Sequence, residues 1–210
     1  MTHPFPLWAN RRQQGADNKE DDFVINYFNN KKGGIVVDIG AADGITSSNS
    51  YKLITEFDWE GILVEPLSQF YQYLQALYAN NNKVTTYHNA VDSQRGEAKL
   101  WLNPDLATQP GYSSLSSRVA QLHQMKSFQT VKTLTFNDLA LPQKIDFLTI
   151  DAEAKDWDII KAIDFDFYEI ELLLCEKSFE DLSKKIYDFM IQKNYRVVYN
   201  NNWIFAKNKK

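Results

Sequence analysis

Short apolar segments rich in β-branched residues alternate with segments of helical periodicity, and this alternation constrains the fold more than any other feature. Nearly continuous apolar strands are predicted at residues 35–39, 61–65, 83–88, 145–150 and 170–176. Helices are predicted at 17–30, 46–57, from the N-cap Ser68 through Tyr78, 156–163 and 182–192. Such strands are typical of a sheet that is covered on both faces. The sequence therefore predicts an α/β fold in which helices cover both faces of a mostly parallel sheet.

The middle and the end of the chain depart from this alternation. Strands at 98–102 and 130–136 flank a loop rich in Pro, Gly and Ser at 103–117 and a short helix at 119–126. A capping pattern, Ser178-x-x-Asp181, precedes the last helix. Segments 195–199 and 203–206, joined by three asparagines, predict a terminal antiparallel hairpin. No repeat or linker divides the chain, so we expect an N-terminal arm at 1–16 and one domain at 17–210.

Composition narrows the classes of partner. The chain has 210 residues and a net charge of −4, which argues against broad binding to nucleic acid or anionic membranes. Cys175 is the single cysteine, which excludes an intramolecular disulfide and a multi-cysteine zinc site. No apolar run reaches the roughly 18 residues of a membrane helix, and the first residues lack a secretory signal. We expect a cytoplasmic protein without nucleic-acid or membrane partners, and we leave a homo-oligomer open.

Ligands of such sheets bind beyond the carboxyl ends of the strands, near the switch in strand order. The first strand runs into Asp38-Ile-Gly40-Ala-Ala-Asp43-Gly44, and four of the eight glycines lie within residues 33–44. The motif lacks the second glycine of G-x-G-x-x-G, and its two acids would repel a pyrophosphate. They would attract a cationic ligand such as S-adenosylmethionine. The alternative is a plain turn in which the glycines serve packing.

Two further strand ends carry residues suited to an adenosine. Glu65, followed by Pro66, closes the second strand, where a carboxylate can accept hydrogen bonds from both ribose hydroxyls. After the third strand come Asn89, Ala90, Val91 and Asp92, where the small apolar pair Ala90 and Val91 is placed to flank an adenine face, with Asp92 available to its amino group. The alternative for Glu65 is a solvated acid at a strand end.

Three acids follow the two late strands. Asp151 and Glu153 come after the strand at 145–150, and Glu176 closes the strand at 170–176. Each is a candidate general base. The alternatives are helix capping for Asp151 and solvated carboxylates for the other two. Clustered acids can also hold a divalent cation, but from the sequence we assign no metal.

In their order, these pieces resemble the FkbM type of S-adenosylmethionine-dependent methyltransferase. The resemblance covers about residues 35–177 and rests on six stretches: 37–44, 48–50, 61–66, 89–91, 111–115 and 145–153. It implies a Rossmann-like class I methyltransferase fold, with a seven-stranded, mostly parallel sheet and a C-terminal antiparallel hairpin. Two departures are Ala154, where the family often has glycine, and Lys177, where it often has histidine.

The resemblance also implies a role for each site residue. The residues expected to hold the methyl donor are Asp38, Gly40, Ala41, Asp43, Gly44, Asn49, Glu65, Pro66, Asn89, Ala90, Asp92 and Asp151. Those expected to contact the acceptor are Tyr112, Ser113 and Ser114, and the expected catalytic acids are Asp151, Glu153 and Glu176.

We therefore expect methylation of a hydroxyl on a small molecule, sugar or glycan. One alternative is a nicotinamide-dependent oxidoreductase, against which the missing G-x-G-x-x-G motif counts. Another is a catalytically inactive methyltransferase-like domain that serves as a binding or scaffold subunit.

Overall fold

The computed structural model describes residues 19–104, 113–199 and 203–208, so the arm predicted at 1–16 lies outside the described residues. Its helices are α1 (Glu20–Tyr27), α2 (Tyr51–Thr55), α3 (Ser68–Tyr78), α4 (Ser117–Leu122), α5 (Asp156–Ile160) and α6 (Glu180–Gln192). Its strands are β1 (Ile35–Ile39), β2 (Glu60–Val64), β3 (Val84–Tyr87), β4 (Ala90–Val91), β5 (Gly96–Trp101), β6 (Phe128–Leu134), β7 (Lys144–Ile150), β8 (Glu169–Glu176), β9 (Tyr195–Tyr199) and β10 (Trp203–Asn208).

Seven strands form the main sheet, in the order β3-β2-β1-β7-β8-β10-β9. The first five are parallel to one another, whereas β10 runs antiparallel to both β8 and β9. The predicted seven-stranded sheet and its C-terminal hairpin are confirmed. The strand order reverses at β1, which lies between β2 and β7, so the ends of β1 and β7 meet at the switch point.

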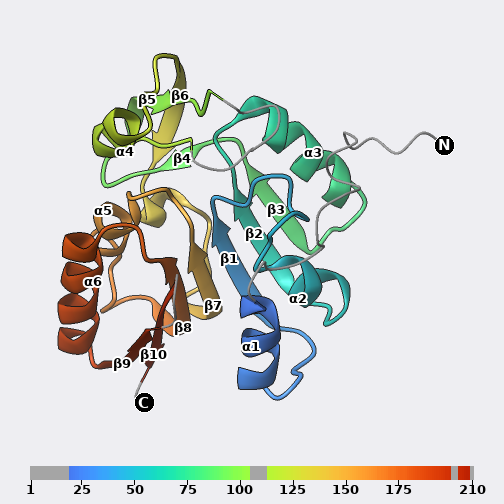
Figure 1. The fold of residues 1–210 in the computed structure, drawn as a ribbon. Coiled ribbons are helices and arrows are strands. Elements are labelled where there is room, and N and C mark those ends of the chain that lie inside the picture. Colours follow the sequence, from blue (N-terminus) through green and yellow to red (C-terminus); the bar gives the residue numbers. More distant parts are fainter. Residues whose placement is uncertain (1–18, 105–112, 200–202, 209–210) are drawn as a thin grey trace.

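The two faces of the sheet are covered by different helices (Figure 1). Val36 packs in a core with α1, α2 and α3, whereas its neighbour Val37 packs in a second core with α5 and α6. This follows from the strand geometry, since successive side chains point to opposite faces. Because both faces are buried, the strands read as continuous apolar runs in the sequence.

A second, smaller sheet has the order β4-β6-β5 and lies beyond the carboxyl ends of β1 and β2 (Figure 1). The sequence predicts strands near β5 and β6 but not that they form a separate sheet. Exposed and buried residues alternate in β6, as in a sheet with one covered face. Leu100 and Val131 of this sheet pack against Phe70 of α3, which fixes the small sheet above the main one.

Three local expectations are wrong. The helix predicted at 46–57 begins only at Tyr51, because residues 43–50 form a loop with its own hydrogen bonds. Ser68 lies inside α3 rather than capping it, and α6 begins without a side-chain cap from the Ser178-x-x-Asp181 pattern. In the described part of the chain, no helix is both long enough and apolar enough to cross a membrane.

Candidate active site

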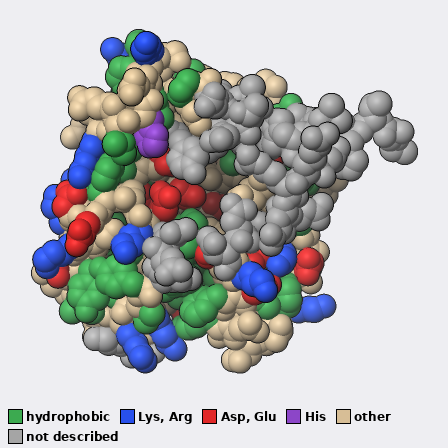
Figure 2. Space-filling view, in the orientation of Figure 1, with side chains coloured by type: hydrophobic (Ala, Val, Ile, Leu, Met, Phe, Trp, Pro, Cys, Tyr) green, Lys and Arg blue, Asp and Glu red, His purple; other side chains and the backbone are tan. Residues whose placement is uncertain are grey.

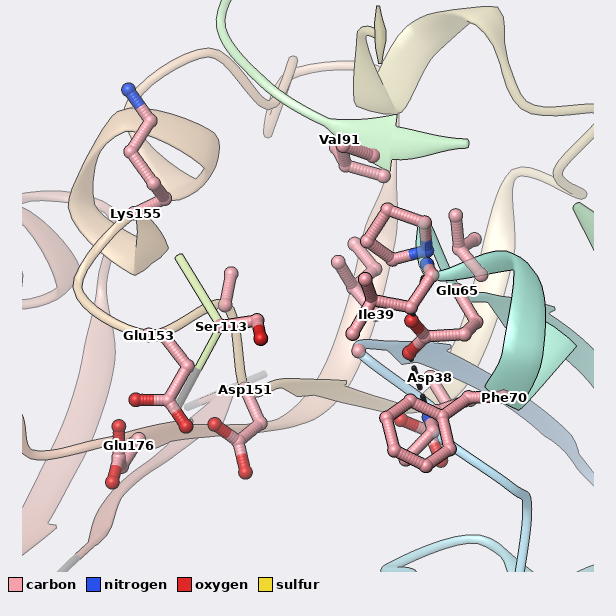
Figure 3. Close-up of a pocket in the computed structure, with 18 of the residues that line it drawn as sticks. Asp38, Ile39, Glu65, Phe70, Val91, Ser113, Asp151, Glu153, Lys155 and Glu176 are labelled. Carbon is pink, nitrogen blue, oxygen red and sulfur yellow. Dashed lines mark hydrogen bonds between the residues drawn. The ribbon is translucent and has the colours of Figure 1, made fainter. Parts of the chain in front are cut away.

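A cavity of about 600 Å³ opens at the carboxyl ends of β1, β2, β7 and β8. Figure 3 shows two groups of carboxylates on its opposite sides. Asp38 and Glu65 lie on one side with Phe70, and Asp151, Glu153 and Glu176 lie on the other. The topology brings these groups together, because they follow strands that are neighbours in the sheet.

Gly40 joins the two halves of the site. Its φ of +91° is strained for any other residue, and a Cβ built there would collide with the backbone carbonyl of Asp151. One residue earlier, the Ile39 carbonyl accepts a hydrogen bond of 2.9 Å from the Asp151 N–H. The chain can therefore turn under the cavity only because residue 40 has no side chain.

Asp38 closes the floor of the cavity and is 5% exposed. The Ser50 hydroxyl donates a hydrogen bond of 2.5 Å to its Oδ2, and Ser48 in turn contacts Ser50. Burial raises the pKa of Asp38 to about 6, although the Ser50 hydrogen bond lowers it in part. An ionised carboxylate here is held at a cost in stability, which a cationic ligand would offset.

Glu65 is held by two backbone groups. The Ala42 N–H donates to Oε2 at 2.9 Å, and the Leu67 N–H donates to Oε1 at 2.7 Å. Burial raises the pKa of Glu65 to about 7, against the effect of these two hydrogen bonds. A carboxylate oxygen has two lone pairs, so each oxygen can still accept a hydrogen bond from a ribose hydroxyl.

Asp43 and Gly44 serve the loop itself. The Asp43 carboxylate accepts hydrogen bonds from the Ile45 N–H, the Thr46 N–H and the Thr46 hydroxyl, at 2.8 to 2.9 Å. Gly44 does not line the cavity; a Cβ there would lie 2.6 Å from the Leu74 side chain of α3. Gly44 therefore fits the alternative in which the glycine serves packing, here against α3. Asp43, in contrast, lines the cavity and holds the loop through its hydrogen bonds.

Asn49 supplies a polar atom that is free to bind a ligand. Its side-chain N–H donates to the Thr149 hydroxyl at 3.1 Å, and its Oδ1 is buried without a hydrogen-bond partner. A buried acceptor without a partner is costly. Since Asn49 lines the cavity, its amide oxygen fits a ligand ammonium group such as that of S-adenosylmethionine.

An apolar wall completes the Glu65 side of the cavity. Its members are side chains of Ile39, Leu67, Phe70, Val91 and Leu100, and Pro66, Asn89 and Ala90 lie beside them. Phe70 follows helical spacing, so in the sequence it reads as core. Asp92 does not line the cavity, and its carboxylate forms an ion pair of 3.2 Å with Lys155.

Three carboxylates meet on the opposite side of the cavity. One oxygen from each of Asp151, Glu153 and Glu176 lies within 4.8 Å of the other two. Burial raises the pKa of Asp151 well above its usual range, and the charges of Glu176 and Glu153 raise it further. Burial also raises the pKa of Glu176. Such pKa shifts in a cavity are typical of functional acids.

Of the three residues predicted to contact the acceptor, one lines the cavity. Tyr112 lies outside the described residues, Ser113 lines the cavity, and Ser114 is buried below the lining. The Ser114 hydroxyl donates a hydrogen bond of 2.5 Å to the Glu153 backbone carbonyl. Glu153 and Ala154 have left-handed φ values of +50° and +71°, so the family's usual glycine is replaced here at a conformation that favours glycine.

The lining residues that sequence reasoning missed include Glu20, Lys155 and Trp203. Glu20 and Trp203 come from α1 and β10, which only the fold brings to the cavity. Lys155 lies two residues after the stretch at 145–153 and was not singled out. Its Nζ pairs with Asp158 at 2.8 Å, and Figure 3 shows it pointing away from the three acids.

Solved structures share this fold at low sequence identity. A precorrin-6y C5,15-methyltransferase of Geobacter metallireducens has a TM-score of 0.53 and 13% identity, over 90% of this chain and 87% of its own. An FkbM methyltransferase of Methylobacillus flagellatus has a TM-score of 0.51 and 15% identity, over 83% of this chain and 43% of its own. An S-adenosylmethionine-dependent O-methyltransferase of Thermotoga maritima has a TM-score of 0.52 and 10% identity, over 97% and 71%.

Sequence comparison gives the family. No curated protein matches the chain, but the model of the methyltransferase FkbM domain matches residues 38–197. The match begins at Asp38 and includes both groups of carboxylates, and it decides against the nicotinamide-dependent alternative. The chain belongs to the FkbM methyltransferase family, and its methyl donor is S-adenosylmethionine.

Proposed function

We propose that this protein methylates a hydroxyl group of a small molecule, sugar or glycan. The observation that carries the proposal is the pairing of two unlike halves in one cavity. One half offers buried carboxylates and an apolar wall, which suit the donor, and the other offers three carboxylates close together, which suit a hydroxyl. S-adenosylmethionine supplies a methyl group on a sulfonium sulfur.

In the donor half, Glu65 would hold the ribose hydroxyls. Asp38 would stabilise the positive charge of the donor, and the Asn49 amide oxygen would accept a hydrogen bond from its ammonium group. Phe70 and Val91 would contact the adenine ring from the apolar wall. These assignments use the polar atoms that the protein itself leaves partly or wholly unsatisfied.

In the acceptor half, a hydroxyl must lose its proton as its oxygen bonds to the methyl carbon. The electron pair of the breaking S–C bond stays on sulfur, and a carboxylate of Asp151, Glu153 or Glu176 takes the proton. Burial raises the pKa of Asp151 and of Glu176, and a base works best when its pKa lies near the working pH. We assign the proton to Glu153, which lines the cavity and whose carboxylate lies within 4.8 Å of both of these acids.

The charge of the cavity supports a small, non-anionic acceptor. Among the described lining residues, seven are acidic and one, Lys155, is basic. Figure 2 shows acidic side chains gathered in a hollow near the middle of the face seen in Figure 1. A nucleic acid would be repelled by this field, so we do not propose an RNA or DNA acceptor, and we keep the expectation of no membrane partner.

An acceptor screen with methyl-labelled donor tests the proposal. We expect transfer to a hydroxyl compound among glycans, sugars and alcohols, with a matched amine and thiol panel as control. Glu153→Gln should slow turnover by about 10²–10⁴-fold and leave donor affinity unchanged. Label on amines or thiols but on no hydroxyl would overturn O-methylation, and equal turnover of the variant would remove Glu153 as the base.

A further inference from the structure

The three acids of the acceptor half form a compact set of oxygen ligands. They come from two strand ends and the loop between them, and one oxygen of each lies within 4.8 Å of the others. Ligand oxygens bound roughly 2.0–2.6 Å from one cation lie at most about 5 Å apart. Lys155, the basic residue of the described lining, makes its ion pairs with Asp92 and Asp158 rather than with these acids.

A fourth acid, Asp156, begins α5 three residues after Glu153. Asp156 is 1% exposed, and neither of its carboxylate oxygens makes a hydrogen bond of ordinary geometry. Burial raises its pKa well above the usual range, and the charges of Glu176 and Glu153 raise it further. The nearby N–H groups of Asp156 and Ala152 offset its burial only in part.

Within the cluster, Asp151 also has a carboxylate oxygen without a hydrogen-bond partner. Its Oδ1 is buried and accepts no hydrogen bond, although the residue lines a polar cavity. Burying carboxylates close together disfavours their ionised forms, because burial and mutual repulsion both raise their pKa values. A cation bound among these groups would remove both the repulsion and the unsatisfied acceptor.

We propose that Asp151, Glu153 and Glu176 bind one divalent cation that prefers oxygen ligands, Mg²⁺ or Mn²⁺, with Asp156 adding negative charge nearby. Three carboxylates leave coordination positions open on the cavity side, since Mg²⁺ usually keeps several positions for water or substrate. The acceptor hydroxyl would occupy one of them. The cation would lower the pKa of that hydroxyl, and the second oxygen of a carboxylate would remain to take the proton.

This inference rests on the proposed function for the place of the acceptor, but the cation site itself can be tested without turnover. Mn²⁺ is the probe, followed by electron paramagnetic resonance in the full chain. We expect one saturable site, weakened by about tenfold or more in the double variant Glu153→Gln/Glu176→Gln. The control is Glu56→Gln/Glu97→Gln, which makes the same change in charge at exposed positions outside the cavity and should bind Mn²⁺ as the native chain does.

Absence of saturable binding at millimolar Mn²⁺, or equal affinity in the native chain and the double variant, would overturn the cation site. Stabilisation of the native chain by methylammonium but not by Mn²⁺ would overturn it in favour of a cationic acceptor. Calorimetry with S-adenosylmethionine on the same samples separates the two proposals. If the chain binds S-adenosylmethionine but shows no saturable Mn²⁺ site, only this inference is contradicted. If the chain does not bind S-adenosylmethionine, the proposed function is contradicted.

Discussion

Gly40 and Asp151 lie backbone against backbone at the switch point of the sheet. The space for a Cβ at Gly40 is filled by the Asp151 carbonyl, and the Asp151 N–H is hydrogen-bonded to the preceding residue of β1, Ile39. One contact thus sets the donor loop and the first acid of the acceptor half relative to each other. The two halves of the cavity are coupled through the main chain.

Gly40→Ala should therefore damage both folding and donor binding. The variant must adopt a φ near +91° or move the Asp151 carbonyl, and we expect a loss of about 3 kcal/mol or more in the free energy of unfolding. Urea unfolding and donor calorimetry measure the two effects. Gly33→Ala is the control, because its φ is +69° and a Cβ there meets nothing within 4 Å. An equal loss in both variants would contradict a special role for the Gly40 contact.

Asp38→Asn should stabilise the ligand-free protein at pH 8. The pKa of about 6 in the folded state lies above the usual 3.8, so this group favours folding at low pH and loses that contribution as pH rises through about 6. At about 1.4 kcal/mol per pKa unit, the ionised carboxylate costs on the order of 3 kcal/mol. We expect urea unfolding to show a gain of about 1–3 kcal/mol at pH 8 and little change at pH 4, together with weaker donor binding. A loss of stability at pH 8 would contradict the inference that the buried, ionised Asp38 carboxylate destabilises the ligand-free protein.

Donor affinity should fall as the medium becomes acidic. The pKa of Glu65 is about 7 in the free protein, and ribose hydroxyls donate best to the ionised form. Protonation therefore competes with binding below pH 7, and we expect affinity to drop about tenfold between pH 8 and pH 6. Calorimetry in buffers of different ionisation enthalpy should detect proton release on binding near pH 7. In Glu65→Gln the pH dependence should flatten, and a flat profile in the native chain would refute this role of Glu65.

Ser114→Ala should reduce turnover more than donor binding. The Ser114 hydroxyl donates to the Glu153 carbonyl and accepts from the Ser116 N–H at 2.9 Å, so it holds the loop that carries Glu153. Removing it takes this hydrogen-bond partner from the Glu153 carbonyl and the Ser116 N–H, which are both partly buried, at a cost of about 1–3 kcal/mol. We expect a lower kcat, a nearly unchanged donor Kd and partial rescue by Ser114→Thr. A change in donor Kd without a change in kcat would place Ser114 in the donor half instead.

Most of the main sheet could be predicted from the sequence, because strands buried on both faces are continuous apolar runs. The small sheet of β4, β5 and β6 could not, since β6 is covered on one face only and β4 has two residues. Residues 46–50, the first part of the helix predicted at 46–57, form a loop instead, because the side chains of Asp43 and Ser48 accept hydrogen bonds from the N–H groups of Thr46 and Tyr51. Competition of this kind leaves little trace in hydrophobic periodicity.

The site could be predicted where residues lie at or directly after the carboxyl end of a strand, as Asp38, Glu65, Asp151 and Glu176 do. It could not be predicted where tertiary packing decides which side of a helix or loop faces the cavity. Phe70 of α3 and Trp203 of β10 belong to this second class. The burial of Asp156, and with it the case for a bound cation, also depends on packing that no local pattern reveals.

The central claim is that Asp38 and its neighbours hold the methyl donor in this cavity. Calorimetric titration of S-adenosylmethionine into the native chain, Asp38→Ala and the control Glu97→Ala tests it most directly, with circular dichroism to confirm folding. We expect one binding site in the native chain and in Glu97→Ala, and no measurable binding in Asp38→Ala. Unchanged affinity in a folded Asp38→Ala protein would contradict it.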